Sequence, residues 1–510
     1  MRIESSVHAV GTIDRRAIDA LDIRRLTSDS RTVRAGDAFA AYPGENRDGR
    51  DYIAQAIAAG ASTVLWESAD FKWKDAWRAE HLGVRGLRHK IGPIASHLYG
   101  RPSSRLWMVG VTGTNGKTSC SQWIAQAFNH LGRRCAVAGT LGNGFPEALE
   151  AGSNTTPDAA WLHGKLRGWY GEGARAVAME VSSHGLEQGR VAGVEFDVAM
   201  FTNLTRDHLD YHGSMSHYRR AKAQLFGWDT LKWSLFNLDD RYGAALARMA
   251  RSTQKPGVNV LGFGFERPAA RGSLPDVQGR NLRMGLDGIS FDAVTPWGSL
   301  HVKSAVLGRF NASNLLGTLT VLLASESGLR ETERVLGALR PVPGRAQSFG
   351  GGALPLVVVD YAHTPDALEK MLLTLREILV QSKRSGRLQS ARLICVFGCG
   401  GERDRGKRAM MGRIATQRAD EVIVTSDNPR GEDPLQIIAE ILQGTTRHGN
   451  VSTVIEARTR AVDEAIATAR PGDIVLIAGK GHEPYQEIKG VRHRYSDAAA
   501  VQASLTRHHA

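Results

Sequence analysis

Short, continuous apolar runs alternate with stretches of helical periodicity over most of the chain. The clearest apolar runs cover residues 106–111, 176–181, 198–201, 356–359, 393–397, 422–425 and 474–478. Runs of this kind are typical of parallel strands that helices cover on both faces of a sheet. The pattern therefore predicts an α/β fold. It places a parallel sheet in the middle of the chain and a doubly wound sheet near its end, with ligand-facing loops at the carboxyl ends of the strands.

Two turns that contain proline, at residues 101–104 and 341–344, divide this pattern into three parts. The first part has a helical stretch at 52–59 and a strand-like stretch at 62–66. A chain of 510 residues is longer than one hydrophobic core usually supports. We therefore predict three domains, which cover residues 1–104, 105–340 and 341–510.

Composition and charge narrow the class of protein. Hydrophobic residues make up 42% of the chain, and the formal net charge is +13. Such an excess of basic over acidic residues is typical of proteins that bind nucleic acid, but here the basic residues are dispersed along the chain. A small anionic substrate explains the same excess, because the positive charge would steer that substrate to its site. Four scattered cysteines favour reduced thiols, although the spacing of Cys395 and Cys399 hints weakly at metal. No segment could cross a bilayer, and residues 1–10 lack the apolar core of a secretory signal, so we expect a cytoplasmic protein.

A glycine-rich turn joins the apolar run at 106–111 to a helical stretch at 119–131. It reads G-V-T-G-T-N-G-K-T from Gly110 to Thr118. Glycines let backbone N–H groups approach a polyphosphate, and the N-terminus of the helix adds positive dipole. Lys117 can reach the β- and γ-phosphates of ATP, and the Thr118 hydroxyl can ligate Mg²⁺. The spacing departs from the common phosphate loop, because Val111 stands five residues before Gly116. The predicted ATP contacts in the turn are Gly113, Thr114, Asn115, Gly116, Lys117, Thr118 and Ser119.

Polar residues follow the next two apolar runs. Glu180 stands near the end of the run at 176–181, where a carboxylate is costly unless it is paired or bound to metal. A salt-bridged structural residue and a Mg²⁺ ligand that acts with Thr118 both remain open. The run at 198–201 is followed by T-N-L-T-R-D-H-L-D-Y-H-G at residues 202–213, which is dense in polar ligands.

The G-T-N-G-K-T turn and the segment at 202–213 resemble motifs of the Mur ligases, the ATP-dependent enzymes that add amino acids in bacterial cell-wall synthesis. The resemblance covers essentially the whole chain, and its motifs occur in family order. It implies a three-domain architecture. A uridine-nucleotide-binding domain would come first, a central ATPase domain of the P-loop type with a parallel sheet second, and a Rossmann-like, doubly wound amino-acid-binding domain last.

The resemblance also implies a magnesium site. From its residues alone, Lys222 in the segment Tyr218-Arg-Arg-Ala-Lys222 is an exposed helix lysine. In the family the matching lysine is carbamylated by CO₂, which turns an ammonium into an anionic oxygen ligand. His208, Glu180, Thr118 and carbamylated Lys222 are then expected to hold Mg²⁺.

Three further residues resemble nucleotide contacts of the family. Asn311, in L-G-R-F-N-A-S-N at 307–314, would lie near the adenine. An ordinary helix start with Asn311 as the N-cap is compatible with that role. Arg345 would neutralise the γ-phosphate, and Asp360 would bind the ribose hydroxyls.

The amino-terminal third contains residues that, read alone, are capping and turn residues. They resemble the uridine-nucleotide-binding domain of the subfamily that adds the third residue of the stem peptide. The implied uracil-nucleotide contacts are Ser28, Ser30, Glu45, Asn46 and Arg47. The implied contacts to the sugar and its peptide are Asn154, Thr155, Thr156, Ser182, Gln188 and Arg190.

The carboxy-terminal third contains the residues expected to select the incoming amino acid. Relatives that add meso-diaminopimelate have the tetrad D-N-P-R, found here at 427–430, whereas lysine-adding relatives lack its arginine. A guanidinium binds the second carboxylate of diaminopimelate in a bidentate manner and repels the ammonium of lysine. The expected diaminopimelate contacts are Arg403, Asp427, Asn428, Pro429, Arg430, Gly479 and Glu483.

The function implied is amide-bond formation through an acyl phosphate, with Lys117, Lys222, His208 and Arg345 as the catalytic residues. The substrates would be ATP, UDP-N-acetylmuramoyl-L-alanyl-D-glutamate and meso-diaminopimelate, and a monomer with no nucleic-acid partner is expected. Two alternatives remain. One is a related amide ligase that adds lysine or extends folate with glutamate. The other is a basic protein that uses ATP to control its binding to nucleic acid.

Overall fold

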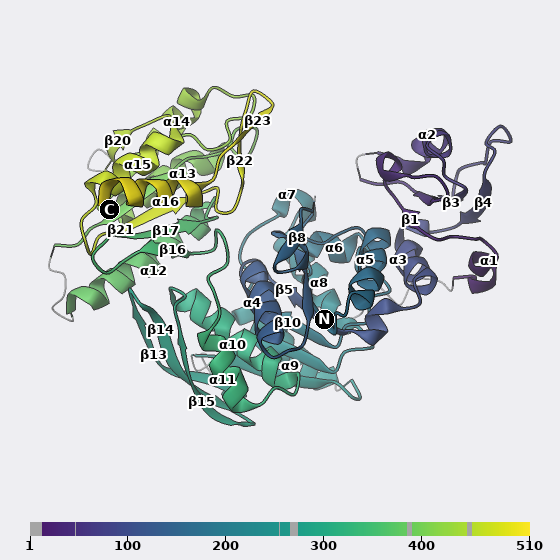
Figure 1. The fold of residues 1–510 in the computed structure, drawn as a ribbon, viewed down its shortest axis with the longest axis horizontal. Coiled ribbons are helices and arrows are strands. Elements are labelled where there is room, and N and C mark those ends of the chain that lie inside the picture. Colours follow the sequence, from purple (N-terminus) through teal and green to yellow (C-terminus); the bar gives the residue numbers. More distant parts are fainter. Residues whose placement is uncertain are drawn as a thin grey trace. The chain divides into compact units, whose positions relative to one another are not determined.

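The computed structural model describes residues 13–45, 47–152, 154–253, 255–265, 274–384, 390–445 and 451–509, and Figure 1 shows its helices and strands. The segment at 1–10, considered above as a targeting signal, lies outside the described residues. The chain forms two compact units. The first contains residues up to Gly279 together with Ala293–Leu300 and Ser313–Val335, and the second contains Arg280–Asp292, His301–Ala312 and Leu336–Ala510. Each unit is described by itself.

The first unit begins with a small parallel sheet in the order β1-β2-β3-β4. Apolar side chains of the inner strands pack on α3 on one face and on α2 on the other. Residues 101–104, expected to be a linker, form most of a 3₁₀ turn in which Pro102 and Ser103 are buried. The elements are α1 (Arg15–Asp19), β1 (Leu26–Thr27), η2 (Ser30–Thr32), β2 (Ala38–Ala41), η3 (Gly49–Tyr52), α2 (Ile53–Ala58), β3 (Thr63–Glu67), β4 (Glu80–Val84), α3 (Leu87–Leu98) and η4 (Pro102–Arg105).

The central sheet has the order β15-β14-β13-β12-β11-β10-β5-β9-β6-β7-β8. Its middle strands pair in parallel and are almost wholly buried, as the continuous apolar runs predict. Its strands are β5 (Trp107–Thr112), β6 (Cys135–Gly139), β7 (Gly142–Phe145), β8 (Ala148–Glu150), β9 (Ala176–Glu180), β10 (Val198–Phe201), β11 (Trp233–Asn237), β12 (Asn259–Gly264), β13 (Val277–Gly285), β14 (Gly288–Thr295) and β15 (Gly298–Ser304). The helices of this section are α4 (Lys117–His130), α5 (Ala159–Gly171), α6 (Ser183–Glu187), α7 (Leu209–His212), α8 (Met215–Ala223), η5 (Gln224–Gly227), α9 (Arg241–Thr253), α10 (Arg309–Ala324) and α11 (Leu329–Gly337).

Strand register brings the predicted polar loops together. Val111 of β5 pairs with Glu180 of β9, and Thr112 pairs with Phe201 of β10. Because the strands are parallel, the loops that follow them leave the same edge of the sheet. The phosphate-loop turn, Glu180 and the segment at 202–213 therefore meet at one place.

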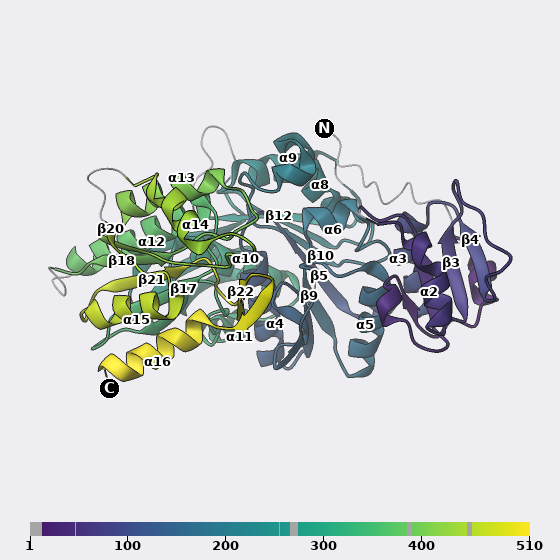
Figure 2. The same cartoon turned by 90° about the horizontal axis from the view of Figure 1, so that it is seen from above.

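The carboxy-terminal part of the second unit is a doubly wound domain, as predicted. Its sheet has the order β16-β17-β21-β18-β19-β20, and β16 is antiparallel to β17 whereas the other strands are parallel. Helices α15 and α16 cover one face, while α12, α13 and α14 lie side by side on the other (Figure 2). The strands are β16 (Gln347–Gly350), β17 (Leu356–Asp360), β18 (Leu393–Phe397), β19 (Glu421–Val424), β20 (Val451–Val454) and β21 (Ile474–Ala478), with a hairpin of β22 (Tyr485–Ile488) and β23 (Val491–Arg494). The helices are α12 (Pro365–Arg384), α13 (Gly406–Arg418), α14 (Pro434–Leu442), α15 (Arg458–Thr468) and α16 (Asp497–His509).

Two composition-based expectations can be compared with the described residues. Cys120, Cys135, Cys395 and Cys399 are buried free thiols. Within the described ranges, none of the helices combines the length and the apolar character that a membrane span needs.

Candidate active site

The glycine-rich turn between β5 and α4 has the backbone geometry of a phosphate cradle. Gly116 has a φ of 87°, and Gly113 has a φ of 149°. A Cβ at Gly116 would lie 2.5 Å from Asn314 Oδ1, and a Cβ at Gly113 would collide with Thr202 Oγ1. Since α4 begins at Lys117, the positive end of its dipole adjoins the turn. Only glycine fits at both positions, so the backbone itself can approach an anion.

Lys222 is buried, so the expectation of an exposed helix lysine is wrong. The residue is 1% exposed, and its Nζ donates to Gly113 O at 2.8 Å. Lys117 donates to the same carbonyl oxygen and to Thr114 O, each at 2.9 Å. Burial lowers the pKa of Lys222 well below its ordinary value, and the charge of Lys117 lowers it further. This environment favours the neutral amine.

Glu180 lies at the end of β9 and is 1% exposed. Its Oε2 accepts a hydrogen bond from Thr118 Oγ1 at 2.9 Å, and its Oε1 accepts one from Thr140 N at 2.7 Å. The carboxylate is thus held by hydroxyl and backbone donors beside the phosphate-loop threonine. Within the described residues no group of three His, Cys, Asp or Glu side chains could hold a metal ion. The residues predicted to bind Mg²⁺ do not form such a group, because they combine Glu180 and His208 with the Thr118 hydroxyl and a carbamate on Lys222.

Histidine rings gather close to these residues. The His208 ring lies 4.9 Å from that of His184, which lies 5.4 Å from that of His212. Burial lowers the pKa of His208, and the charge of Lys117 lowers it further. Burial also lowers the pKa of His212 to about 4, so this ring is neutral near pH 7. His184 and His212 were not predicted as site residues, although His212 stands in the segment at 202–213 that pointed to His208.

Residues predicted to bind the sugar and its peptide line the end of β9. Thr156 Oγ1 donates to Ser182 Oγ at 3.0 Å, and Arg190 Nη1 donates to Thr156 O at 2.9 Å. Thr140 Oγ1 donates to Thr155 Oγ1 at 3.1 Å and to Glu180 Oε2 at 3.2 Å. The predicted sugar–peptide group and the predicted metal group are therefore neighbours.

The predicted uracil-nucleotide residues contact side chains outside their own group. Glu45 accepts hydrogen bonds from Gln188 Nε2 at 2.6 Å and Tyr211 Oη at 2.7 Å. Arg47 Nη1 donates to Tyr52 Oη at 3.4 Å. Asn46 lies outside the described residues. The residues after β1 act as capping residues, as their types suggest, because the Asp29 side chain caps η2, which begins at Ser30. The Ser28 side chain is hydrogen-bonded to that of Tyr42.

Arg345 and Asp360 lie in the second unit. The Arg345 guanidinium is 4.8 Å from the centre of the Tyr361 ring. Asp360 Oδ2 accepts a hydrogen bond from Ala346 N at 2.7 Å, and burial raises the pKa of Asp360 to about 6. Asn311 is not an N-cap, because α10 begins at Arg309, and its side chain donates to Leu307 O at 3.0 Å.

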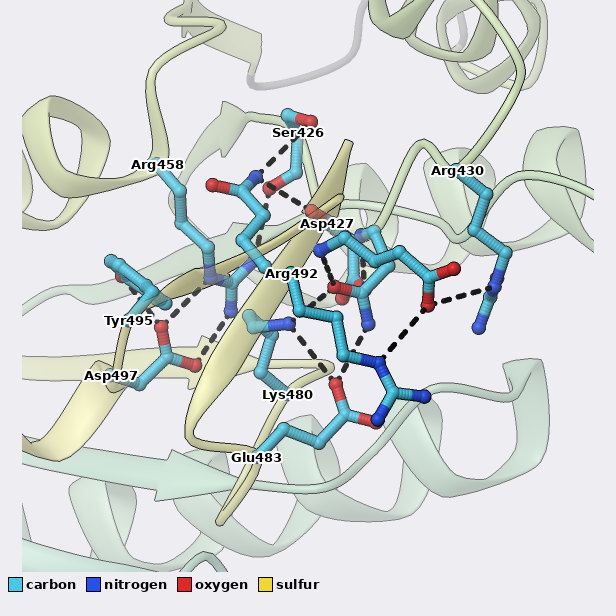
Figure 3. A network of polar contacts seen from close by, with 12 residues as sticks. Ser426, Asp427, Arg430, Arg458, Lys480, Glu483, Arg492, Tyr495 and Asp497 are labelled. Carbon is cyan, nitrogen blue, oxygen red and sulfur yellow. Dashed lines mark hydrogen bonds and ion pairs between the residues drawn. The ribbon is translucent and has the colours of Figure 1, made fainter. Parts of the chain in front are cut away.

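The residues predicted to bind the amino acid lie in the loops after β18, β19 and β21, and Figure 3 shows Arg430 and Glu483 of the last two loops. Asn428 Nδ2 donates to Glu483 Oε2 at 2.8 Å. A Cβ at Gly400 would lie 3.0 Å from Arg430 Nη1 and 3.9 Å from Arg403 Cγ, so both arginines border the same turn. Arg430 has a φ of 52°, and its backbone N–H donates to the Glu487 carbonyl on the hairpin at 3.0 Å. Cations and a carboxylate thus share one small region.

Family models match three stretches of the chain. The model described as "Mur ligase family, catalytic domain" matches residues 22–99, "Mur ligase middle domain" matches 111–322, and "Mur ligase, glutamate ligase domain" matches 344–481. This chain belongs to the Mur ligase family.

Curated relatives and solved structures agree with this membership. Two relatives named UDP-N-acetylmuramoyl-L-alanyl-D-glutamate–2,6-diaminopimelate ligase, from Nitrosomonas europaea and Chromobacterium violaceum, are each 48% identical to this Mur ligase. The first match covers 95% of this chain and 93% of the relative, and the second covers 95% of each. A solved structure with the same name is 36% identical, has a TM-score of 0.70, and covers 98% of this chain and 100% of its own. A solved structure named UDP-N-acetylmuramoylalanyl-D-glutamyl-2,6-diaminopimelate–D-alanyl-D-alanyl ligase, from Acinetobacter baumannii, shares the fold. It is 18% identical, has a TM-score of 0.63, and covers 95% of this chain and 93% of its own.

In this Mur ligase, residues that were not predicted as diaminopimelate contacts lie beside the predicted ones. Glu487 Oε2 lies 4.0 Å from Arg430 Nε and 3.9 Å from Arg492 Nε. Lys480 has a buried side chain between Asn428 and Glu483. The motif G-K-G-H-E contains Lys480, but its burial depends on loops that are distant in sequence.

Proposed function

We propose that this Mur ligase joins meso-diaminopimelate to UDP-N-acetylmuramoyl-L-alanyl-D-glutamate at the expense of ATP, in peptidoglycan precursor synthesis. The first three curated relatives, 48% identical over 95% of this chain, all have the corresponding name. The match covers each of the three predicted domains, for which we keep the boundaries 1–104, 105–340 and 341–510.

The observation that supports the amino acid most directly is that Arg430 and Glu483 stand in neighbouring loops, because Glu483 accepts a hydrogen bond from Asn428 of the loop that contains Arg430. Meso-diaminopimelate presents an ammonium and a carboxylate at its distal end, whereas lysine presents only an ammonium. Arg430 supplies a guanidinium for the carboxylate, and Glu483, held by Asn428 at 2.8 Å, supplies a carboxylate for the ammonium. A lysine substrate would offer Arg430 no carboxylate and would bring a second cation into a partly enclosed site.

The reaction would proceed in two steps. The γ-phosphoryl group of ATP is transferred to an oxygen of the D-glutamyl carboxylate, and ADP leaves. The amine of diaminopimelate then attacks the acyl carbon, a C–N bond forms, the bond to the phosphate oxygen breaks, and the amine loses a proton as phosphate departs. Backbone N–H groups of the phosphate loop, Lys117 and Arg345 would stabilise the charge in transfer, so positioning and electrostatics supply most of the rate.

Thr118, Glu180, His208 and a carbamate of Lys222 are the residues we assign to Mg²⁺. Their donor set fits a hard cation, because the hydroxyl, the carboxylate and the carbamate all supply oxygen. Bound Mg²⁺ would neutralise phosphate charge. The buried Lys222 amine fits a group that reacts with CO₂, since a lowered pKa favours the neutral, nucleophilic form of an amine. We further propose that the enzyme acts as a monomer in the cytoplasm, where its ATP substrate is found.

The test is a ligation assay with purified protein, ATP, Mg²⁺, the UDP-sugar dipeptide and either diaminopimelate or lysine. Phosphate release and the mass of the product are measured, with each component omitted in turn. We expect release only in the complete mixture with diaminopimelate, and a product heavier by one diaminopimelate residue. Efficient use of lysine would overturn the amino-acid assignment. ATP hydrolysis that responds to DNA or RNA instead of the UDP-sugar dipeptide would overturn the ligase assignment.

A further inference from the structure

Lys480 is a buried cation within the predicted amino-acid site. Its side chain is 0% exposed, whereas that of Glu483 is 20% exposed. Its Nζ donates to Asn428 Oδ1 at 2.8 Å and to Glu483 Oε2 at 3.0 Å (Figure 3). A buried ammonium is tolerated only when it is paired and hydrogen-bonded, and both requirements are met here.

The contacts of Lys480 determine how the Asn428 amide is turned. Asn428 Oδ1 accepts from Lys480 and also from Glu487 N at 2.9 Å, while its Nδ2 donates to Glu483 Oε2 at 2.8 Å. The amide oxygen faces two donors and the amide nitrogen faces a carboxylate. A flipped amide would place its NH₂ group against an ammonium and a backbone N–H, so this orientation is strongly favoured.

Glu483 is held at one oxygen by the same set. Its Oε2 receives hydrogen bonds from both Lys480 and Asn428, which fixes the side chain in one orientation. Within the described part of the chain the hydrogen bonds of this carboxylate are made by Oε2, which leaves Oε1 to accept from a ligand. Because Glu483 is the more exposed member of the pair, the ligand would contact Glu483 and not Lys480.

We propose that Lys480 is a positioning residue, which holds Asn428 and Glu483 in the orientation that receives the distal ammonium of diaminopimelate. This inference rests on the proposed function. Lys480 acts through Glu483, and its positive charge also balances that carboxylate when no ligand is bound. Its role therefore differs from that of Arg430, which meets the distal carboxylate itself.

The first test replaces Lys480 with methionine, which has a similar length and no charge, in the ligation assay. We expect the KM for diaminopimelate to rise at least tenfold, while kcat and the KM values for ATP and the UDP-sugar dipeptide change less than threefold. Lys489→Met, at an exposed lysine on the turn of the β22–β23 hairpin, is the matched control and should leave all three KM values unchanged. An unchanged KM for diaminopimelate in Lys480→Met would overturn the proposal, since the lysine would then have no effect on binding. A lower KM would also overturn it, since the lysine would then only repel the ligand ammonium.

The second test asks whether Lys480 acts through Glu483. The loss in the double variant Glu483→Gln/Lys480→Met should be smaller than the two single losses combined, because most of the effect of the lysine on the ligand passes through the Glu483 carboxylate. Additive losses would contradict this. If circular dichroism shows that Lys480→Met does not fold, Lys480→Leu, which likewise lacks both the charge and the hydrogen-bond donor, takes its place with the same two outcomes. Failure of the unmutated protein to release phosphate with diaminopimelate would refute the proposed function, whereas an active protein that tolerates the Lys480 variant would refute only the positioning role.

Discussion

Alanine at Gly116 should weaken ATP binding, whereas alanine at Gly132 should not. The two glycines flank the same helix, α4, and have φ values of 87° and 77°. Any L-residue pays about 1–2 kcal/mol for a left-handed backbone of this kind, so the strain is the same at both ends. A Cβ at Gly132 would meet no heavy atom within 4 Å, but a Cβ at Gly116 would lie 2.5 Å from Asn314 Oδ1. The pair therefore isolates one steric contact in the phosphate loop.

Relief of that contact must move either Asn314 or the turn that precedes α4. A shift of the turn loses at least one backbone hydrogen bond to a phosphate oxygen, and a bond to a charged group is worth about 1.5–3 kcal/mol. We thus expect the KM for ATP to rise roughly tenfold or more in Gly116→Ala, since about 1.4 kcal/mol corresponds to a factor of ten. Gly132→Ala should change it less than twofold.

The assay varies ATP at saturating concentrations of the other substrates and measures phosphate release, and thermal melts are recorded for both variants. Both melting temperatures should fall, because the backbone strain is shared, and the fall should be larger in Gly116→Ala, which must also relieve the contact with Asn314. Equal ATP KM values in the two variants would refute the argument that Gly116 is required at the nucleotide. A loss of melting temperature confined to Gly116→Ala would refute the argument that the strain is equal.

Three further predictions concern the assigned residues. Lys222→Ala should lose most activity, and a short carboxylic acid should restore part of it by replacing the carbamate. If Lys222→Ala turned over as fast as the unmutated enzyme in CO₂-depleted buffer, the assignment would be contradicted. Arg430→Ala should raise the KM for diaminopimelate far more than that for ATP, since removal of one partner of an enclosed ion pair costs roughly 2–5 kcal/mol, whereas Arg494→Ala on the exposed strand β23 should change neither. Burial raises the pKa of Asp360 from an ordinary 3.8 to about 6, so the folded state holds this proton more firmly and loses stability as the pH rises between those values. Asp360→Asn should therefore melt above the unmutated protein at pH 8 and level with it near pH 4, and the reverse order would refute the shift.

Strands buried on both faces were the easiest elements to predict from the sequence. The run at 198–201 coincides with β10, and the run at 393–397 coincides with β18, because residues on both sides of these strands must be apolar. The parallel arrangement then followed from the alternation with helices. For the same reason the loops after these strands, with Glu180 and the D-N-P-R tetrad, could be expected at the ligand-binding edge of each sheet.

Side-chain environments were harder to predict, because they depend on contacts between residues distant in sequence. Lys222 lies on a helix of only nine residues, and it is buried by a contact with Gly113, which is 109 positions away. Periodicity over such a short helix does not distinguish a covered face from an exposed one. Asn311 was misplaced as an N-cap for a local reason, since α10 begins two residues before it. Helix boundaries of this kind are the least certain part of any pattern.

The environment of Lys222 connects its burial with its proposed chemistry. Lys117 and Lys222 donate to one carbonyl oxygen, that of Gly113, at 2.9 Å and 2.8 Å. Two ammonium groups this close repel each other, and burial removes the water that would screen them, so Lys222 is favoured as the neutral amine. A neutral amine has the lone pair that attack on CO₂ requires, whereas an ammonium does not. Once formed, a carbamate would place a negative charge beside Lys117 and turn the repulsion into attraction. The same arrangement therefore favours both the reactive form of the lysine and its modified product.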